Sequence, residues 1–196
     1  MKVYHMSDTL PLNTEMTADY KQTLELIQPF VQALERSEDC FFGALMAAKH
    51  QKAVLRKFGL QDMWTNYIKW ATEAIFEFIR KQEFPESCSR ITGHYFFDHL
   101  ESCQELFKVD WGDASGEERA KIHLYEVELE DENPRALDMR MFDEAFDAMW
   151  ENEDIHTAII CARRYFRGEA TQSPVWEILS DARAVAVADL TEKLQS

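Results

Sequence analysis

The spacing of the apolar residues changes along the chain, and this change restricts the fold more than any other feature. Residues 14–84 carry apolar side chains at intervals of three and four, the period of one face of an α-helix. After Pro85 the period shortens, and residues 122–130 come to alternate apolar and acidic side chains, as strands do. This pattern predicts an α+β fold in one domain, residues 1–196, with a helical lobe at 14–84 inserted after a first strand.

Stripes of apolar residues predict several helices. The clearest stripe starts at Trp64, and Pro85 stops it. In an earlier stripe that includes Leu24, we expect Pro29 to kink or split the helix, because its ring removes a hydrogen bond. Gly168 is placed to end the last helix. We expect helices within residues 18–34, 41–58, 64–84, 99–107, 142–150 and 158–166.

β-Branched and aromatic residues predict strands at both ends of the chain and between the helices. Tyr125, Val127 and Leu129 alternate with glutamates, so one face of their strand is expected to be buried and the other wet. Residues 110–118, rich in Gly, Asp and Ser, are expected to form a loop. We expect strands within residues 2–5, 91–97, 122–130, 176–179 and 184–188.

The acidic composition limits the partners of the chain. Its 196 residues hold 21 Lys and Arg against 36 Asp and Glu, a formal net charge of −15, and 46% are hydrophobic, enough for one sizeable core. Surfaces that follow nucleic-acid phosphates are usually basic, which disfavours an extended surface of that kind and leaves room only for a local basic pocket. No apolar run reaches the roughly 18 residues of a membrane span, and no secretory leader precedes the first strand, so we expect a cytoplasmic protein without a membrane partner.

Several large enzyme classes lack their motifs in this sequence. The six glycines never fall in the spacing of a Rossmann or P-loop phosphate site, and neither a Gly-x-Ser-x-Gly elbow nor a His-Glu-x-x-His helix is present. Four residues of the types that bind zinc lie close together in the sequence, at Cys88, His94, His99 and Cys103. His94 is expected on a strand, at a phase unrelated to the helix face of His99 and Cys103, so no metal site is predicted.

Three short segments on expected strands carry His, Tyr and Glu in that order. The segment Gly93–Phe96, followed by Ser102, is similar to the Gly-x-Tyr-Phe strand and Ser-rich helix of the ADP-ribosyltransferase superfamily. Tyr4 and His5 resemble the first-strand motif of its His-Tyr-Glu branch, which includes diphtheria toxin and poly-ADP-ribose polymerases, and Glu177 resembles the late-strand Glu of that branch. The chain also resembles an uncharacterised bacterial and phage family with that fold, through Phe76-Glu77-x-Ile79-Arg80, Phe84-Pro85, Ser89-Arg90 and Tyr165-Phe166-Arg167-Gly168. The resemblance covers the strands and their flanks and implies an α+β fold with a split β-sheet core.

The resemblance implies NAD as substrate and a role for each residue. Cleavage of the nicotinamide glycosidic bond passes through an oxocarbenium-like ribose, so a carboxylate at Glu177 gains attraction as positive charge develops. The ring of Tyr95 would stack on the nicotinamide and hold it in the reactive geometry. His5 would bond the adenine-side ribose and fix the pose of NAD, and Arg90 would pair with the pyrophosphate.

Two departures from the family pattern matter. The second stacking aromatic of the family aligns with Leu106, and only Phe107 beside it would replace that ring. Val175 stands two residues before Glu177, where arginine-modifying toxins carry Glu or Gln, so arginine modification is not supported. Each site residue also has a purely structural alternative. Tyr95 would belong to the core, His5 to a strand edge and Glu177 to the solvated surface. Arg90 would form an ion pair with a local acid.

These observations predict NAD-dependent mono-ADP-ribosylation, a glycosyl transfer, of a macromolecular acceptor. The resemblance implies a toxin or phage-defence factor, with a neutralising antitoxin as partner. A protein acceptor is slightly favoured over RNA or DNA, because the one basic cluster near the proposed Glu in the sequence is formed by only three residues, Arg163, Arg164 and Arg167. The loop 168–176 is expected to choose the acceptor. RNA 2′-phosphotransfer or NAD hydrolysis on the same fold, and a non-catalytic acidic module that binds a protein, remain open as alternatives.

Overall fold

The computed structural model describes the chain as two compact units. The described residues are 1–17, 20–58 and 66–194. The strand unit comprises residues 1–18, 93–138 and 175–196. The helical unit comprises residues 19–92 and 139–174. Helices and strands are both present in separate runs, which confirms the α+β class.

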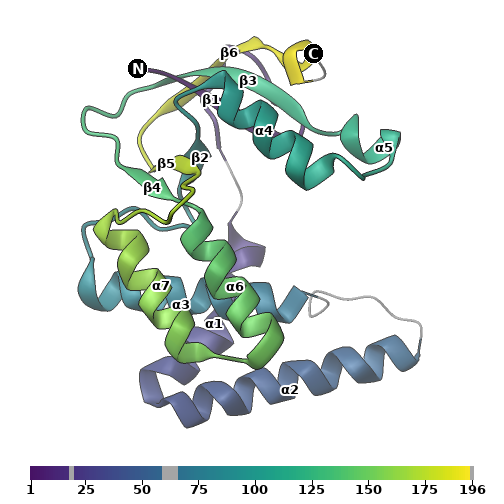
Figure 1. Cartoon of the computed structure of the whole chain (residues 1–196), viewed down its shortest axis with the longest axis vertical. Coiled ribbons are helices and arrows are strands. Elements are labelled where there is room, and N and C mark those ends of the chain that lie inside the picture. The colour runs from purple at the N-terminus through teal and green to yellow at the C-terminus, as the bar shows by residue number, and fades with distance from the viewer. Residues whose placement is uncertain (18–19, 59–65, 195–196) are drawn as a thin grey trace. The chain divides into compact units, whose positions relative to one another are not determined.

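The strand unit contains two antiparallel sheets of three strands among its described residues (Figure 1). One sheet has the order β1-β3-β6 and the other the order β2-β5-β4. The strand bounds are Lys2–Ser7 (β1), His94–Phe96 (β2), His123–Leu129 (β3), Ala136–Asp138 (β4), Trp176–Ser180 (β5) and Ala184–Asp189 (β6). The same unit holds helices at Leu100–Trp111 (α4), Gly116–Arg119 (α5) and Thr191–Leu194, the last a 3₁₀ helix.

Strand β3 lies in the centre of its sheet and confirms the predicted alternation. It pairs antiparallel with β1 on one side and with β6 on the other. Tyr125, Val127 and Leu129 are at most 1% exposed, whereas Glu128 between them is exposed. The apolar face of β3 therefore forms the middle of the core. The core cluster also contains Val3, Met16, Phe96, Ile178, Ala184 and Ala186.

Some local predictions for the strand unit were wrong. Strand β4 was not predicted, because Ala136–Asp138 is too short to show an alternation. Part of the predicted loop is helical, since α4 continues to Trp111 and α5 begins at Gly116. The start of α5 is stabilised by a capping box, in which Ser115 and Glu118 each accept from the other's backbone N–H. The predicted strand around Tyr95 is real but shorter than expected.

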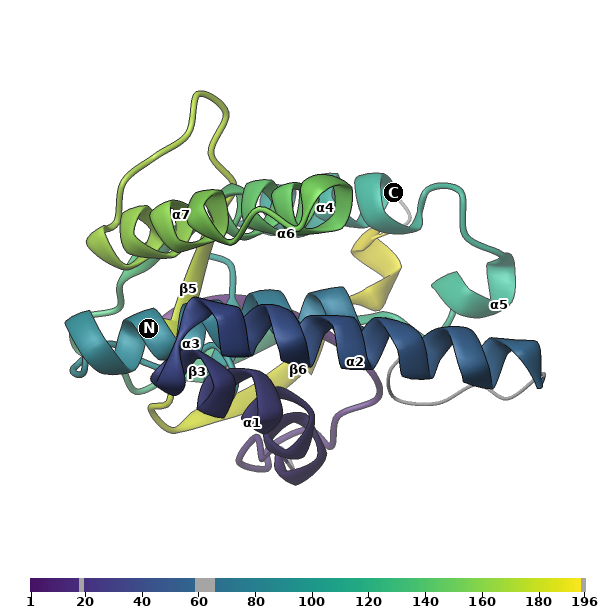
Figure 2. The same cartoon turned by 90° about the horizontal axis from the view of Figure 1, so that it is seen from below.

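Helix α3 lies in the centre of the helical unit. It packs against α1, α6 and α7, and α6 runs alongside α7 (Figure 2). The helix bounds are Lys21–Arg36 (α1), Glu38–Lys57 (α2), Tyr67–Glu83 (α3), Arg140–Asn152 (α6) and Ile155–Arg167 (α7). Helices α1 to α3 form the predicted insertion after β1, and α6 and α7 join them in one unit. Across the described residues, no helix combines the length and the apolar character needed to cross a membrane.

The helical unit also differs from the sequence pattern in detail. Helix α1 continues through Pro29, because burial of Phe30 and its neighbours offsets a proline cost of about 3 kcal/mol. Leu24 and Trp150, both expected on apolar stripes, are 41% and 61% exposed. Gly168 ends α7 with a φ of 73°, the left-handed conformation that glycine adopts without strain, as predicted. The expected start at Trp64 lies outside the described residues.

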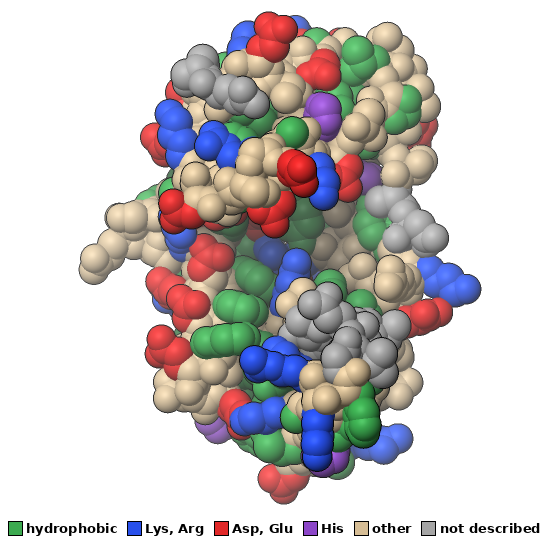
Figure 3. All heavy atoms as spheres, turned by 90° about the vertical axis from the view of Figure 1, so that its right-hand side faces the viewer, with side chains coloured by type: hydrophobic (Ala, Val, Ile, Leu, Met, Phe, Trp, Pro, Cys, Tyr) green, Lys and Arg blue, Asp and Glu red, His purple; other side chains and the backbone are tan. Residues whose placement is uncertain are grey.

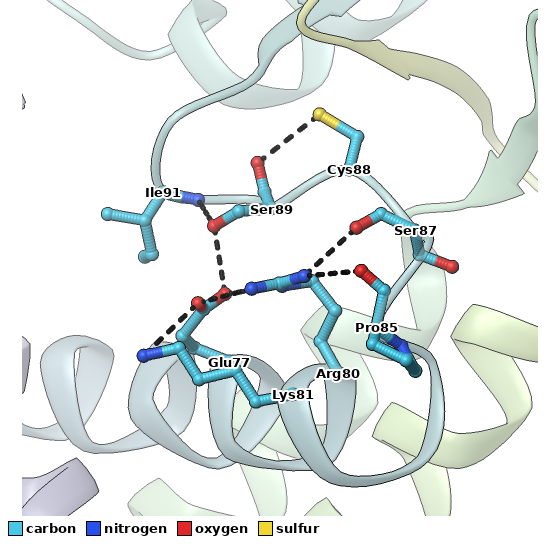
Figure 4. A network of polar contacts seen from close by, with 8 residues as sticks. All are labelled: Glu77, Arg80, Lys81, Pro85, Ser87, Cys88, Ser89 and Ile91. Carbon is cyan, nitrogen blue, oxygen red and sulfur yellow. Dashed lines mark hydrogen bonds and ion pairs between the residues drawn. The ribbon is translucent and has the colours of Figure 1, made fainter.

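A polar network ties the end of α3 to the segment that follows it (Figure 4). Arg80 donates to the carboxylate of Glu77 at 2.8 and 2.9 Å and to the carbonyl oxygens of Pro85 and Ser87 at 3.4 and 3.1 Å. The hydroxyl of Ser89 donates to the same carboxylate at 2.8 Å. Burial alone would raise the pKa of Glu77, but the hydrogen bonds from Arg80 and Ser89 outweigh it and hold the pKa below its ordinary value of 4.5.

We expect Glu77→Gln to lower the free energy of unfolding by about 3 kcal/mol near neutral pH, because the largely buried Arg80 loses the charge that balances its own. Denaturation in urea measures the loss. The stabilisation from Glu77 is fully present above the ordinary carboxyl pKa of 4.5 and disappears as the pH falls through the lowered pKa of the folded state. The stabilities of the two proteins should therefore converge in acid.

Glu83→Gln is the matched control, because Glu83 lies on the same helix and forms an exposed ion pair with Arg163 at 2.7 Å. This change should cost at most about 1 kcal/mol. Equal losses in the two variants would show that the network around Arg80 contributes no more than a surface ion pair.

Candidate active site

The three residues expected at the site lie on neighbouring strands. A bridge between Tyr4 and Phe97 joins β1 to β2, where the N–H of each residue donates to the carbonyl of the other, at 2.7 and 2.8 Å. Strand β2 pairs in turn with β5. His5, Tyr95 and Glu177 therefore come from three adjacent strands, although they are far apart in the sequence.

The side chains of Tyr95 and Glu177 share one face of their sheet. Tyr95 lies directly opposite Leu179 in the ladder, and opposite residues point to the same side. Glu177 stands two positions before Leu179, so the alternation along β5 returns it to that face. Diagonal neighbours of this kind have Cα atoms about 7–8 Å apart.

His5 points to the opposite face of the sheet, which differs from the single NAD site that the resemblance implies for His5, Tyr95 and Glu177. Its neighbour Tyr4 is bridged to β2 on the face of Tyr95, and alternation along β1 turns His5 away. Its ring centroid lies 5.6 Å from that of Phe96 and 6.4 Å from that of His94. The link from His5 to Tyr95 runs through the backbone, since Nδ1 is 2.6 Å from the Tyr95 carbonyl oxygen.

This hydrogen bond fixes the tautomer of His5. A carbonyl oxygen only accepts, so Nδ1 carries the proton of the neutral ring and Nε2 holds the lone pair. Burial lowers the pKa of His5 below 6.5, and the bond to Tyr95 opposes this only in part. Burial also lowers the pKa of His94. Two imidazoles that favour the neutral form therefore lie beside each other in the strand unit.

Glu177 is a carboxylate in the interior. The residue is 3% exposed and lies opposite Leu137 of β4. All of β5 after its first residue is buried. In such an environment the local dielectric is low, so a carboxylate interacts strongly with positive charge that develops beside it.

Two aspartates that sequence reasoning missed hold β5 at its ends. Asp138, fully buried, accepts from the backbone N–H of Val175 at 2.9 Å, directly before the strand. Asp131 accepts from the hydroxyl of Ser180 at 2.6 Å, at the last residue of the strand. Glu177 lies between these two attachments. In the sequence, Asp138 follows an apolar pair, Ala136 and Leu137. Two apolar residues are too few to predict the strand that carries this aspartate.

Phe107 belongs to the core, which corrects its expected role as a second stacking ring. It is 1% exposed. Its ring stacks on Trp111 with centroids 5.9 Å apart, and the guanidinium of Arg119 lies 5.2 Å from its centroid. A ring that stacks on nicotinamide needs an open face, and Phe107 has none without rearrangement of the core.

Arg90 belongs to the helical unit and is already paired, which corrects its expected role with a pyrophosphate. Its side chain is 8% exposed, and Nε lies 3.2 Å from a carboxylate oxygen of Glu73. It also donates to the hydroxyl of Tyr165 at 3.0 Å, and its guanidinium carbon lies 4.4 Å from the ring centroid of Phe142. Arg90 therefore connects α3 with α6 and α7.

A comparison with family models places the chain in a family. The model of the family described as "Protein of unknown function (DUF2441)" matches residues 3–192, which is nearly the whole chain. The chain belongs to this family. A search of the curated proteins found no match. The description of the family carries no reaction, so the function is argued from the site.

We expect the free energy of unfolding to fall as the pH drops from about 7.5 to about 5.5, and to fall less in His5→Gln. The folded pKa of His5 lies below its ordinary value of 6.5, so the unfolded state binds the proton first and gains population below that pH. Denaturant unfolding at several pH values measures the slope. Part of the slope remains in the variant, because His94 acts in the same direction.

His50→Gln is the control for this measurement, since it removes an exposed histidine of α2. It should keep the slope of the unsubstituted protein. A slope that is unchanged in His5→Gln would contradict the buried, neutral ring assigned to His5.

Proposed function

We propose that this chain is an NAD-dependent mono-ADP-ribosyltransferase with Tyr95 and Glu177 at its reactive centre. The observation that carries the proposal is the adjacency of β1, β2 and β5, with both side chains on one face. Through the bridge between Tyr4 and Phe97, the strand order becomes β4-β5-β2-β1-β3-β6. This order supports a split sheet of the ADP-ribosyltransferase kind, in which the first, middle and late strands lie side by side.

Glu177 supplies negative charge where the reaction develops positive charge. The bond between the ribose carbon and nicotinamide breaks, its electron pair leaves with nicotinamide, and the ribose becomes oxocarbenium-like. The acceptor then forms a bond to that carbon and loses its proton. A preorganised electrostatic contact of this kind is worth about 3 to 4 kcal/mol of barrier. The buried position of Glu177 supports this role, because water does not screen the carboxylate.

Tyr95 orients the nicotinamide beside Glu177. Its ring is partly exposed, and the diagonal position on the ladder lets one bound group contact both side chains. His5 acts as a positioning residue in this proposal. Its Nδ1–H holds the carbonyl of Tyr95 and so fixes the backbone from which the ring projects.

The segment before β5 supports an acceptor site. Thr171, Gln172 and Ser173 line a cavity of about 760 Å³ in the helical unit. Ser173 lies four residues before Glu177 in the sequence. The cavity is also lined by three acids of α6, Asp143, Glu144 and Asp147, and by two arginines, Arg140 and Arg164. These arginines are paired with the acids, so the lining favours a basic protein segment over a phosphate-bearing acceptor.

Val175 restricts the acceptor group. An acid at this position would hold or deprotonate a guanidinium, and valine does neither. A protein acceptor modified at a group other than arginine fits both Val175 and the acidic cavity. The proposed biological role is that of a cytoplasmic toxin or phage-defence factor with a neutralising antitoxin, and this role rests on the resemblance alone.

Incubation of the purified protein with labelled NAD and cell lysate tests the proposal. Label transferred to a protease-sensitive fraction supports mono-ADP-ribosylation of a protein. Label in a nuclease-sensitive fraction would identify a nucleic-acid acceptor, and free ADP-ribose alone would indicate an NAD glycohydrolase. Intact NAD would favour a non-catalytic binding module.

We expect Glu177→Gln to reduce transfer by roughly a hundredfold or more while NAD binding stays nearly unchanged. The amide keeps the shape of the side chain and removes only the charge that matters as the oxocarbenium forms. Label transfer and calorimetric binding of NAD measure the two effects. Glu128→Gln, at an exposed position of β3, is the matched control and should retain full transfer. Unchanged turnover in Glu177→Gln would mean that another group carries the chemistry.

We expect replacement of Thr171, Gln172 and Ser173 by alanine to lower transfer to the acceptor while slow NAD hydrolysis persists. Polar side chains on a loop orient the acceptor without entering the NAD site. The ratio of transferred label to free ADP-ribose reports this selectivity. If hydrolysis and transfer fall equally, the loop serves NAD binding and the assignment is wrong.

A further inference from the structure

The helical unit contains another cavity, whose lining is basic and aromatic. It has a volume of about 420 Å³ and lies between the second half of α2, the start of α3 and the end of α6. This volume falls in the range of small-molecule sites, about 300–1,000 Å³. The charged and aromatic residues of its lining are Lys49, Lys52, Arg56, Tyr67, Trp150 and Glu153. All of them lie outside the reaction centre proposed for the strand unit.

The cations of this cavity share one face of α2. Lys49, Lys52 and Arg56 follow each other at intervals of three and four residues, which places them on successive turns. Lys49 forms an ion pair with Glu153 at 2.6 Å. In the part of the chain that the structure describes, no carboxylate is within ion-pair distance of Lys52 or Arg56. In the lower part of the view in Figure 3, Lys and Arg side chains gather beside hydrophobic ones. This acidic chain therefore carries a local cluster of cations at the cavity.

Trp150 provides an exposed aromatic surface at the same cavity. The residue is 61% exposed, and its indole is held from one side by Phe146, with centroids 6.1 Å apart and planes 22° from parallel. The ammonium of Lys52 lies 5.9 Å from the ring centroid of Trp150 and 5.5 Å from that of Tyr67. These distances are close to the limit of about 6 Å for a cation–π contact, so the ammonium retains donors for another partner.

We propose that this cavity binds a nucleotide, with its phosphate at Lys52 and Arg56 and its base stacked on Trp150. An inorganic anion would use the cations but not the indole, and a neutral aromatic ligand would use the indole but not the cations. A nucleotide uses both, because it joins a phosphate to a flat ring. The ligand is a free mononucleotide or one unit of single-stranded RNA or DNA, which present the same chemistry.

The charge distribution limits how the site binds a strand. Because the net charge is −15, binding depends on the few cations of the cavity and not on a general attraction for phosphates. Each phosphate neutralised on a single strand contributes about −0.7 to the slope of log affinity against log salt. Two cations that contact phosphate predict a slope of about −1.4, much shallower than that of an extended nucleic-acid surface.

Fluorescence anisotropy with a labelled single-stranded oligonucleotide of about eight residues tests the proposal, with AMP, inorganic phosphate and a phosphotyrosine peptide as competitors. Trp150→Ala should weaken binding about tenfold or more, and Trp150→Phe should retain most of it. Lys52→Gln and Arg56→Gln should each weaken binding and each make the salt slope shallower by about 0.7. Thermal unfolding of each variant verifies that the helical unit remains folded.

Lys69→Gln is the matched control, because Lys69 also lies beside a tryptophan, 5.4 Å from the ring centroid of Trp70, but does not line the cavity. It should leave binding unchanged. An oligonucleotide that binds more tightly than AMP identifies a nucleic-acid strand as the source of the ligand, and equal binding identifies a free nucleotide. The proposal is overturned if Lys69→Gln weakens binding as much as Arg56→Gln, or if Trp150→Ala has no effect. It is also overturned if inorganic phosphate or the phosphopeptide competes as well as AMP.

Discussion

Two backbone hydrogen bonds, between Tyr4 and Phe97, connect the sheets of the strand unit, and the candidate active site depends on them. Without this bridge, β1 belongs to one sheet and β2 and β5 to the other. With it, the first strand of the chain lies beside the strand that carries Tyr95. The same bridge sets which side chains of β1 face that residue, because side chains along a strand alternate between faces. A shift of one residue in this pairing would exchange the faces of the sheet to which Tyr4 and His5 point.

The parts of the fold with a clear period were predictable from the sequence, and the parts that depend on pairing were not. The alternation at Tyr125, Val127 and Leu129 locates β3, and Gly168 locates the end of α7. The face to which His5 points is set by the bridge between Tyr4 and Phe97, and a single sequence does not reveal such a long-range pairing. Arg90 and Phe107 show a second limit. Their residue types suit a binding site, but Arg90 is held by Glu73 and Tyr165, and Phe107 is buried against Trp111. Composition does not reveal such partners.

The net charge of the chain does not describe the charge that lines each of its cavities. Helix α6 lines both cavities of the helical unit described above, with acids in its first turns and with Trp150 near its end. The acidic cavity suits a basic protein segment, and the basic one suits a phosphate beside an aromatic ring. The total of −15 disfavours an extended phosphate-binding surface, yet it leaves room for a local cluster of cations on α2. Spacing within that helix was the available signal, because residues 49, 52 and 56 fall on one face.

The proposed function assigns Tyr95 and Glu177 to the reactive centre of an enzyme that breaks the nicotinamide bond of NAD. Release of nicotinamide by the purified protein, followed by chromatography with and without an acceptor extract, tests this claim most directly. We expect slow release by the protein alone and faster release when the extract is added, because the acceptor replaces water as nucleophile. Absence of release under both conditions, with a protein shown to be folded, would contradict it.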